Sequence, residues 1–466
     1  MIKKLMALLT AALMLAVMLP LTASAETYPT PEGYNDNDYQ KLVTFLETTS
    51  EKSVRNGKSA FGVNYDPADP ETWKNEYAYI EWIAVDGQLR VHDIQVSSKS
   101  LYGALDLSGC TALKILYCSN NITELNLNGC TALEELGCAS TSLTELDITN
   151  NTELRVLYCS VNNFTELDIT KNSKLEELYC EFNNLSELDV TKNTELKWLY
   201  CGNNNLTELN VTKNSKLEWL NCESNDLTEL DITKNTALTR LNCEGNDLTE
   251  LDVTKNTALE WLNCEENDLT ELDVSECAAL EILNCFGNNL TELNVSACTA
   301  LEELHCTFNN LTELDVSGCT ALIMFNCSGN KLSDIRTASY NFGDNHLYVN
   351  GNGYVEADNY SRFNEDLSND EDYGDYCELD VTAIPMEGNV FIGWYDSEGN
   401  LVSSEAEYVL EYGTDYTLEA RFEGSEPAGT DKTPVMGPVL IIGIAAAVVV
   451  VAVIVILLIR MRKKAK

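Results

Sequence analysis

The sequence is poor in basic residues, so most of its acids have no cation to balance them. Thirty Lys and Arg stand against 74 Asp and Glu, for a formal net charge of -44 at pH 7. Seven of those bases lie in two terminal segments, 1–25 and 460–466, that hold no acid. Phosphate binding needs the opposite sign of charge, so the imbalance argues against nucleic acid and anionic membrane surfaces as partners.

Residues that carry catalysis or bind metals are also scarce. The three histidines, His92, His305 and His346, lie in different segments, and no metal-ligand spacing or nucleotide-binding glycine motif occurs. A single histidine on a strand is more typical of a surface position than of a general base, which needs a positioned partner. The sequence therefore predicts no enzyme and no cofactor. A glycosidase that uses two of the many carboxylates is the enzyme alternative.

The abundant feature is one repeated unit, which extends from Leu101 to about Ile335. A copy reads Leu-x-x-Leu-x-Cys-x-x-Asn-x-Leu-Thr-Glu-Leu-Asp-Val-Thr-x-Asn-Thr-x and is 21 residues long. The copy that begins at Leu113 is one residue shorter. From there the first leucine recurs at Leu133, Leu154, Leu175, Leu196, Leu217, Leu238, Leu259, Leu280, Leu301 and Leu322. Self-similarity at a fixed period of this length indicates a solenoid.

The two halves of the unit predict different structure. The first half alternates as a strand does, with the second Leu and the Cys pointing inward. The Asn at the ninth position can bond backbone groups where the chain leaves the strand. The second half has three inward apolar positions and no room for a long helix, so we expect extended or short 3₁₀ structure there.

The ends of the chain predict an exported protein with one membrane anchor. Residues 1–25 combine Lys3 and Lys4, an apolar core and Ala-Ser-Ala, as secretory signal peptides do. Residues 436–459 carry no charge and precede a basic tail. At about 1.5 Å per residue this run just crosses a bilayer core of about 30 Å, with the tail inside. We expect a plasma-membrane protein whose N-terminal region lies outside the cell.

Seventeen cysteines in an exported protein would ordinarily suggest disulfides, but their spacing predicts thiols. Eleven occupy the sixth position of successive copies, from Cys118 to Cys327, and would stack as a buried column. Five more, between Cys110 and Cys319, lie in the turn before the next copy, where the middle copies have Asn. Neighbours in register point side by side, which suits disulfide torsions poorly.

The unit resembles a leucine-rich repeat. Cys in place of one inward Leu, with the Leu-Asp-Val/Ile-Ser/Thr-x-Asn/Cys half, is similar to the cysteine-ladder internalin group of bacterial surface proteins. The resemblance implies an α/β-type repeat solenoid, mostly strand and turn, on the surface of a Gram-positive-type cell. Thr141 departs from it by replacing the ninth-position Asn, and no Leu-Pro-x-Thr-Gly sortase signal precedes the apolar run. We therefore expect a membrane anchor rather than attachment to the cell wall.

The segment before the repeats predicts a cap, since an open solenoid end would expose core. Asn35 to Asp38 can cap a helix that ends near Glu47, and 80–85 and 88–91 flank Asp-Gly as the arms of a hairpin do. A separate binding domain is the alternative for this segment.

After the repeats, short alternating strands with Gly393-Trp394-Tyr395 resemble the β-rich repeat that follows internalin-like solenoids, and we expect this domain to act as a stalk. Binding by this domain is the alternative. The whole chain then divides into a signal peptide 1–25, cap region 26–100, leucine-rich repeat solenoid 101–335, small all-β domain 336–422, linker 423–435, transmembrane helix 436–459 and basic cytoplasmic tail 460–466.

The outward, concave side of the predicted strands carries aromatic residues in two adjacent columns. Core packing does not explain them, because Leu and Cys already fill the inward positions. Coils stack about 4.8 Å apart, so the rings form a patch of the kind that marks a protein interface or a sugar-stacking platform. Packing of the rings on one another is the alternative. The candidate ligand-binding residues are Tyr158, Tyr179, Tyr200, Trp198, Trp219 and Trp261.

The opposite, convex side carries a Glu column and an Asp column. Stacked like charges repel one another, and Lys residues in the middle copies offset part of the repulsion. A solvated face is the simpler interpretation, because the columns lack a Ca²⁺ loop pattern; a cation-binding spine is the alternative.

Taken together, the patterns favour adhesion or recognition without catalysis. We expect a monomer whose concave face binds an extracellular protein or glycan, with a basic or neutral partner favoured by the acids on that face. A structural spacer and a cell-surface enzyme that processes glycans or peptides are the alternatives. The fold sets a surface and not a partner.

Overall fold

The computed structural model describes residues 28–49, 53–97, 101–118, 121–339, 343–349, 353–358, 379–386, 389–410 and 416–424. They fall in one compact unit that ends at Gly424. The predicted signal peptide, transmembrane helix and basic tail lie outside the described residues, as does Cys377. No helix within the described ranges is both long and apolar enough to cross a bilayer.

The predicted N-terminal helix and hairpin are confirmed. Helix α2 spans Asp36–Glu47, and the Asn35 side chain caps it by accepting a hydrogen bond from the Asp38 N–H at 3.3 Å. Two short helices follow, α3 at Asn56–Phe61 and η1 at Pro70–Thr72. Strands β1 (Tyr79–Val85) and β2 (Gln88–Gln95) then pair antiparallel across Asp86 and Gly87. Their φ values of 50° and 81° are those of the tight turn that suits a hairpin.

A buried ion pair ties this segment together. The Asp38 carboxylate, fully buried, accepts hydrogen bonds from Arg90 Nε at 2.7 Å and from the Val91 N–H at 3.1 Å. Strand β2 in turn pairs in parallel with β4 (Ile115–Tyr117), the first short strand of the repeats. The hairpin therefore covers the edge that the first coil would otherwise expose.

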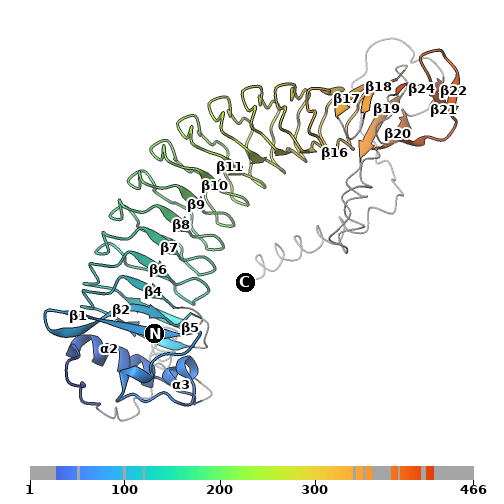
Figure 1. The fold of residues 1–466 in the computed structure, drawn as a ribbon. Helices are drawn as coiled ribbons and strands as arrows, with labels where there is room; N and C mark the ends of the chain where they lie inside the picture. The colour runs from blue at the N-terminus through green and yellow to red at the C-terminus, as the bar shows by residue number, and fades with distance from the viewer. Residues whose placement is uncertain are drawn as a thin grey trace, which may run out of the picture. The chain divides into compact units, whose positions relative to one another are not determined.

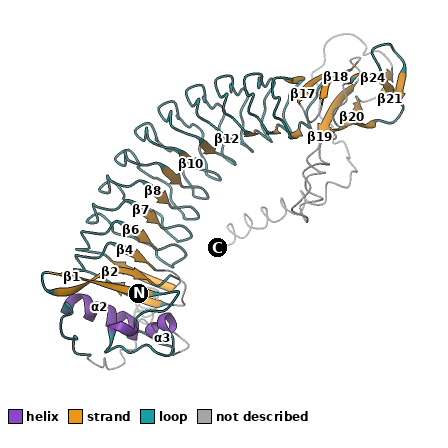
Figure 2. Ribbon diagram, viewed as in Figure 1, coloured by secondary structure: helices purple, strands orange, loops and turns teal. Residues whose placement is uncertain are grey.

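The repeats form a parallel sheet of three-residue strands, one strand to a coil, along the inner side of the stacked coils (Figures 1 and 2). We name each coil by the leucine that begins it. Neighbouring strands pair residue for residue, so each repeat position forms a straight column. After β4 the strands are β6 (Glu135–Gly137), β7 (Val156–Tyr158), β8 (Glu177–Tyr179), β9 (Trp198–Tyr200), β10 (Trp219–Asn221), β11 (Arg240–Asn242), β12 (Trp261–Asn263), β13 (Ile282–Asn284), β14 (Glu303–His305) and β16 (Met324–Asn326).

The other half of each coil is mostly turn and extended structure, as expected. Strands occur there near the two ends of the array: β3 (Tyr102–Asp106) pairs in parallel with β5 (Asn121–Asn126), and β15 (Glu313–Val316) lies in a late coil.

The core consists of inward Leu, Val or Ile and Cys. All sixteen cysteines in the described ranges are buried, and no disulfide joins any of them. The predicted thiols are thus confirmed for these residues. Burial raises the pKa of the Cys201 thiol well above its ordinary value, which keeps it protonated and unreactive.

A ladder of buried amides stitches successive coils together, as predicted. The Asn204 Nδ2 donates to the Cys180 and Cys201 carbonyls at 3.1 and 3.0 Å, and its Oδ1 accepts from the Leu185 N–H at 3.0 Å. Thr141, the exception to the pattern, ends the ladder by donating from Oγ1 to Asn162 Oδ1 at 2.5 Å. The ladder explains why the ninth position is Asn: both ends of the side chain are bonded to backbone that water cannot reach.

The strands after the repeats continue the solenoid's own sheets. Strand β17 (Asp334–Ser339) pairs with β15, and β19 (Gly353–Asp358) pairs with β16. The first sheet runs on through β20 (Leu379–Pro385) and β23 (Glu407–Leu410). The second includes β18 (Gly343–Val349), β24 (Thr417–Gly424), β21 (Asn389–Tyr395) and β22 (Leu401–Ser403). The all-β segment expected from the sequence is present and is hydrogen-bonded to the last coils.

Candidate ligand-binding face

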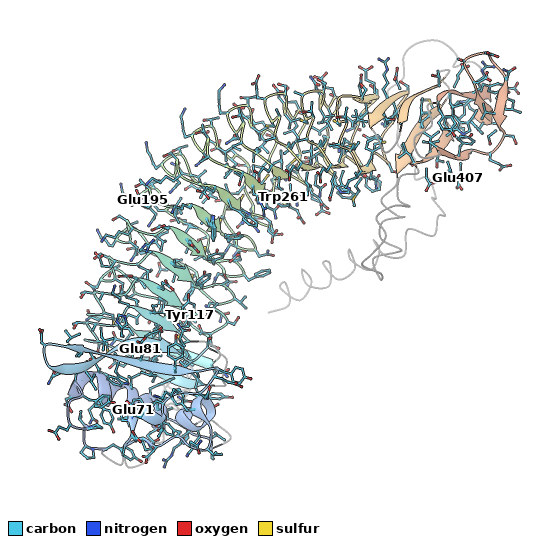
Figure 3. All side chains as sticks on the ribbon, viewed as in Figure 1. Glu71, Glu81, Tyr117, Glu195, Trp261 and Glu407 are labelled. Carbon is cyan, nitrogen blue, oxygen red and sulfur yellow. The ribbon has the colours of Figure 1, made fainter. Side chains whose placement is uncertain are left out.

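The sheet register brings the outward aromatic residues together. Tyr158 pairs with Tyr179, and Tyr179 pairs with Tyr200, on consecutive strands. In the adjacent column Trp198 pairs with Trp219. Figure 3 places Tyr117 and Trp261 on this strand side and Glu195 on the opposite side. We call the strand side of the coils the strand face.

Four of the predicted residues belong to one continuous stack of rings. The ring centroids of Tyr158 and Tyr179 lie 4.5 Å apart, and those of Tyr179 and Tyr200 lie 4.7 Å apart, with interplanar angles of 21° and 12°. Trp219 continues the stack at 5.1 Å from Tyr200. The Arg240 guanidinium closes it, 4.7 Å above the Trp219 ring.

The stack also extends in the other direction, across a coil that lacks an aromatic residue. Tyr117 lies 6.0 Å from Tyr158, although Gly137 separates them in the column. A Cβ atom on Gly137 would collide with the Tyr117 ring, so only glycine leaves room for the ring to lean over this coil. We call the series Tyr117, Tyr158, Tyr179, Tyr200, Trp219 and Arg240 the aromatic column.

Stacking determines which parts of the rings a ligand can reach. Rings that lie nearly parallel at less than 5 Å cover one another's faces and leave their edges and hydroxyl groups toward solvent. Burial, followed by the charge of Glu181, raises the pKa of Tyr200 to about 12. Burial and Glu177 raise the pKa of Tyr179, whose hydroxyl donates to Glu177 Oε2 at 3.4 Å. The hydroxyls therefore stay protonated at neutral pH and can donate hydrogen bonds.

The other two predicted residues lie beside the column. Trp198 is 38% exposed, one of the larger exposed apolar side chains among the described residues. Trp261 pairs with Arg240 in the strand register, at the end of the aromatic column. The prediction missed Arg240 and the bridge over Gly137. The register could have revealed Arg240, whereas the lean of the Tyr117 ring depends on side-chain packing.

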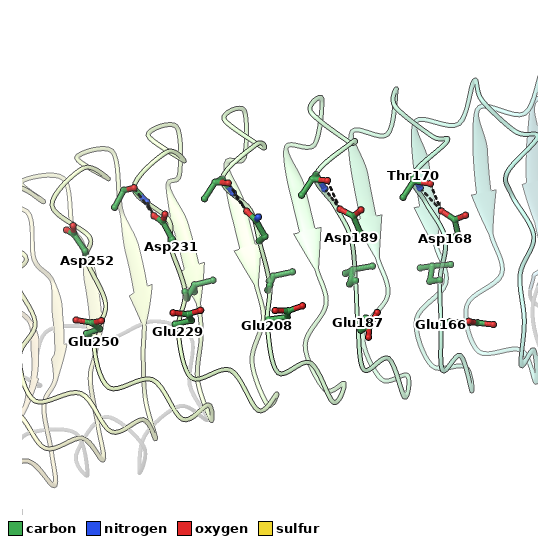
Figure 4. Close-up of a pocket in the computed structure, with 18 residues that line it drawn as sticks. Glu166, Asp168, Thr170, Glu187, Asp189, Glu208, Glu229, Asp231, Glu250 and Asp252 are labelled. Atoms are coloured by element: carbon green, nitrogen blue, oxygen red, sulfur yellow. Dashed lines mark hydrogen bonds between the residues drawn. The ribbon is translucent and has the colours of Figure 1, made fainter.

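A groove of about 1100 Å³ lies away from these residues, along the predicted acidic columns (Figure 4). It is lined by the Glu, Leu and Asp or Asn side chains of successive coils between Glu166 and Asp252. Its Asp carboxylates are engaged in local turns: Asp168 Oδ1, for instance, accepts from the Thr170 N–H at 2.9 Å and from Thr170 Oγ1 at 2.6 Å. These bonds lower the pKa of Asp168.

The groove combines acids that are already hydrogen-bonded with exposed Glu side chains, as a solvated face does. Within the described ranges, no group of three or more His, Cys, Asp or Glu residues is placed to hold a metal ion. The cation-binding spine considered from the sequence remains an untested alternative.

Comparison with solved structures identifies the repeat. The functional domain of InlJ from Listeria monocytogenes, described as including a cysteine ladder, is 41% identical, with a TM-score of 0.50. The match covers 51% of this chain and 54% of the InlJ domain, so it extends over about half of each. The solenoid is a cysteine-ladder leucine-rich repeat.

Two further leucine-rich repeat structures resemble the chain more weakly. The internalin InlF of Listeria monocytogenes is 20% identical over 54% of this chain and 86% of its own, with a TM-score of 0.44. A leucine-rich repeat protein of Leptospira interrogans is 24% identical over 50% of this chain and 79% of its own, with a TM-score of 0.41. No protein-family model and no curated protein matches the sequence.

Comparison with the InlJ domain separates the features of the leucine-rich repeat that both chains share from those particular to this chain. The buried Cys column belongs to the ladder that the InlJ domain also includes. The aromatic column lies on the outward side of the same strands. Its tyrosines are not required by the repeat, because their position holds Asn from Asn221 to Asn284.

Proposed function

We propose that this protein is displayed on a bacterial cell surface and binds an extracellular protein through the strand face of its leucine-rich repeat. The aromatic column with its neighbours Trp198 and Trp261 carries the proposal. These side chains are large and point away from a core that Leu and Cys already fill, and the tyrosines occupy a position where the same repeat also accepts Asn. Aromatic residues in such a setting are typical of interface hot spots.

The geometry favours a protein over a glycan as the ligand. A sugar ring binds an aromatic platform through the open face of the ring, and stacking covers the faces of Tyr158, Tyr179 and Tyr200. Ring edges and tyrosine hydroxyls suit the mixed apolar and hydrogen-bonding contacts of a protein interface. The partner is neutral or basic, because Glu135, Glu177 and other acids surround the rings.

Display at the cell surface rests on the chain termini. The leader-like residues 1–25 and the apolar run 436–459 with its basic tail support export and a single C-terminal anchor. In that arrangement the repeat projects outward, where an extracellular partner can reach it.

A structural spacer is the second candidate, and one observation favours it. The aromatic column joins coils from Leu113 to Leu238 through ring contacts, so it adds cohesion between coils whether or not anything binds. A spacer needs this cohesion but has no use for the exposed Trp198.

The two candidates are separated by probing arrays of extracellular proteins and glycans with the full chain. A Trp198→Ala, Trp261→Ala variant removes the two tryptophans beside the aromatic column and leaves the stack of tyrosines intact. Glu187→Ala, in the groove on the opposite side, is the matched control. A protein hit that the Trp variant loses and the Glu187 variant keeps supports the proposal.

Other outcomes assign the function elsewhere. A hit lost only in Glu187→Ala would place binding in the groove. A glycan hit lost in the Trp variant would leave the strand face as the binding site but identify the ligand as a glycan rather than a protein. The absence of any hit would favour the spacer.

A further inference from the structure

The turn that follows each strand has an unusual backbone. At the eighth position of ten successive coils, φ is positive, from 49° at Glu266 to 69° at Gly329. Glycine and asparagine are the residues that adopt this left-handed conformation readily. A Cβ on Gly245 or Gly287 would meet its nearest neighbours at 3.6 and 3.7 Å, so the turn has space for side chains there and the backbone alone disfavours them.

Two adjacent coils nonetheless place large apolar residues at this position. Val161 has φ 58° and Phe182 has φ 54°, and their side chains are 51% and 56% exposed. A β-branched residue in this conformation is a genuine outlier, and a bulky aromatic residue is strained as well. Both residues thus combine backbone strain with exposure of apolar surface to water.

Phe308 shows what an in-chain reason for such a residue looks like. It has the same conformation, with φ 54°, and is 59% exposed. Its ring packs edge-on against Phe286 at 5.4 Å and fills the space above Gly329. Among the ring contacts found in the described ranges, none involves Phe182, so its strain has no comparable compensation.

The surroundings of Val161 and Phe182 differ in charge from those of the coils that follow. We call the coils of Leu154, Leu175 and Leu196 the tyrosine coils, and those of Leu217, Leu238 and Leu259 the asparagine coils. At positions seven, eight and ten, the tyrosine coils carry one acid, Glu181, and no base. The asparagine coils carry seven acids and no base at these positions, among them Glu223, Glu244 and Glu265.

The acids of the asparagine coils are held in place. Asn242, Asn263 and Asn284 each donate from Nδ2 to the Glu of the preceding coil, at 2.5, 2.9 and 2.6 Å. The carboxylates therefore form a fixed row beside the turn. An apolar patch and an oriented anionic row thus follow one another along the same edge of the solenoid.

We propose that this edge is a docking surface for a protein partner that presents an apolar patch flanked by basic side chains. Val161 and Phe182 pack against the apolar patch of the partner, and the acids of the asparagine coils pair with the basic side chains of the partner. The inference rests on the proposed binding function and identifies the chemistry of the partner. Charge selects it, since an anionic lipid surface would be repelled and a basic protein attracted.

The strain supports a role in binding because it is avoidable. Three other coils use glycine at this position, and glycine would relieve the strain and remove the exposed apolar side chain at once. Residues that keep such strain are concentrated at binding sites and other functional positions.

The test uses the full chain and a Val161→Gly, Phe182→Gly variant, with Phe308→Gly as the matched control. Because the position is natively glycine at Gly245, Gly287 and Gly329, the variants should fold. We expect the double variant to melt about 2 °C above the wild type, and Phe308→Gly to gain less because it loses the contact with Phe286. A lower melting temperature for the double variant would show that the two side chains stabilise the chain itself, which would overturn the inference.

The binding probe is a phage library of random 15-residue peptides, selected on the wild-type chain alone and then measured on each variant. We expect enriched peptides that combine Lys or Arg with aromatic or aliphatic residues. Their binding should fall about ten-fold on the double variant, should weaken at high salt, and should be unchanged on Phe308→Gly.

The outcomes separate this inference from the proposed function. Peptides that lose binding on Trp198→Ala but keep it on the double variant would leave the strand face as the site and refute the edge. Enrichment of acidic peptides would refute the partner chemistry. Failure to enrich any peptide, together with an empty array experiment, would overturn both proposals.

Discussion

The tyrosine coils and the asparagine coils share one interior and present two different surfaces. Both have the same inward Leu and Cys, the same ninth-position Asn and the same strand register. On the strand face, one group stacks tyrosine rings and the other lines up Asn221, Asn242 and Asn263. At the adjoining turn, one group exposes Val161 and Phe182 and carries one acid, whereas the other carries seven acids. Since the interior is constant, packing of the core does not determine the outward differences, and the surface varies from coil to coil within one fold.

The largest expected effect tests the shared interior. Asn204→Ala in a tyrosine coil and Asn246→Ala in an asparagine coil each remove a buried amide that bonds four backbone groups. Leaving those groups unsatisfied should lower the free energy of unfolding by about 3 kcal/mol in both coils.

Urea denaturation measures the two variants, with exposed Asn205→Ala as the control that should change little. Unequal losses at Asn204 and Asn246 would contradict the view that the two groups of coils share one interior.

The next effect tests the surfaces. Tyr179→Ala removes a ring stacked on both neighbours, and we expect a loss of about 2 kcal/mol from packing and lost ring contacts. Asn242→Ala, at the same position in an asparagine coil, removes a bond donated to Glu223 and a bond accepted from the Glu244 N–H, and should lose about 1 kcal/mol. Urea midpoints for the two variants give the comparison directly. A Tyr179 variant as stable as the wild type would show that the aromatic column adds nothing to cohesion and would weaken the spacer hypothesis.

A smaller effect concerns the turn column in which the middle copies have Asn and the copies toward both ends have Cys. Asn214 Nδ2 donates to the Val190 and Asn193 carbonyls at 3.0 and 2.8 Å, but its Oδ1 is buried without a partner in the described structure. Cys277, in the same column, makes only weak contacts to two carbonyls, at 3.8 and 3.9 Å, and has no acceptor left over.

Asn214→Cys therefore exchanges two good hydrogen bonds and one unsatisfied acceptor for a small apolar thiol. The opposing terms should leave the free energy of unfolding within about 1 kcal/mol of the wild type. Thermal melting under reducing conditions measures it, and Asn214→Ala, which has no donor at all, is the control. A much larger loss for the Cys variant would mean that the column is not interchangeable.

The smallest effect is a pH dependence of opposite sign on the two sides of the solenoid. Burial raises the pKa of Glu244 and Glu265, so these carboxylates bind protons more readily in the folded state than in the unfolded state. Their contribution to stability therefore rises as pH falls from 7 toward 4.5. Hydrogen bonds from Thr lower the pKa of Asp168 and Asp231, so their contribution is lost as pH falls below 3.8.

Melting temperature measured between pH 7 and pH 3 should therefore pass through a shallow maximum. Glu244→Gln should flatten the rise on acidification and leave the fall below pH 3.8 unchanged. A rise of the same size in the Gln variant would rule out Glu244 as its source.

Much of the fold could be predicted from the sequence because the period and the apolar alternation of the repeat determine the stacking of coils and the position of each strand. The 21-residue period indicated a solenoid, and alternation around the inward Leu and Cys placed the strands. The start of the cap helix was marked by the polar run from Asn35 to Asp38, of which Asn35 is the cap, and the hairpin was marked by Asp86-Gly87. The leader and the anchor lie outside the described residues, so both stay predictions. The ligand-binding role of the six aromatic residues also stays a prediction until a partner is tested.

The sequence by itself determined which residues share a column. With a fixed period, equivalent residues of successive coils align along the solenoid whatever the details of packing. Only the tertiary structure decided how the columns present themselves. The lean of Tyr117 over Gly137, the covered faces of the tyrosines and the guanidinium above Trp219 depend on distances between coils. The left-handed turn at Val161 and Phe182 depends on how the chain leaves the strand to reach the asparagine ladder. Period is a property of the chain, whereas exposure and strain arise only when neighbouring coils meet.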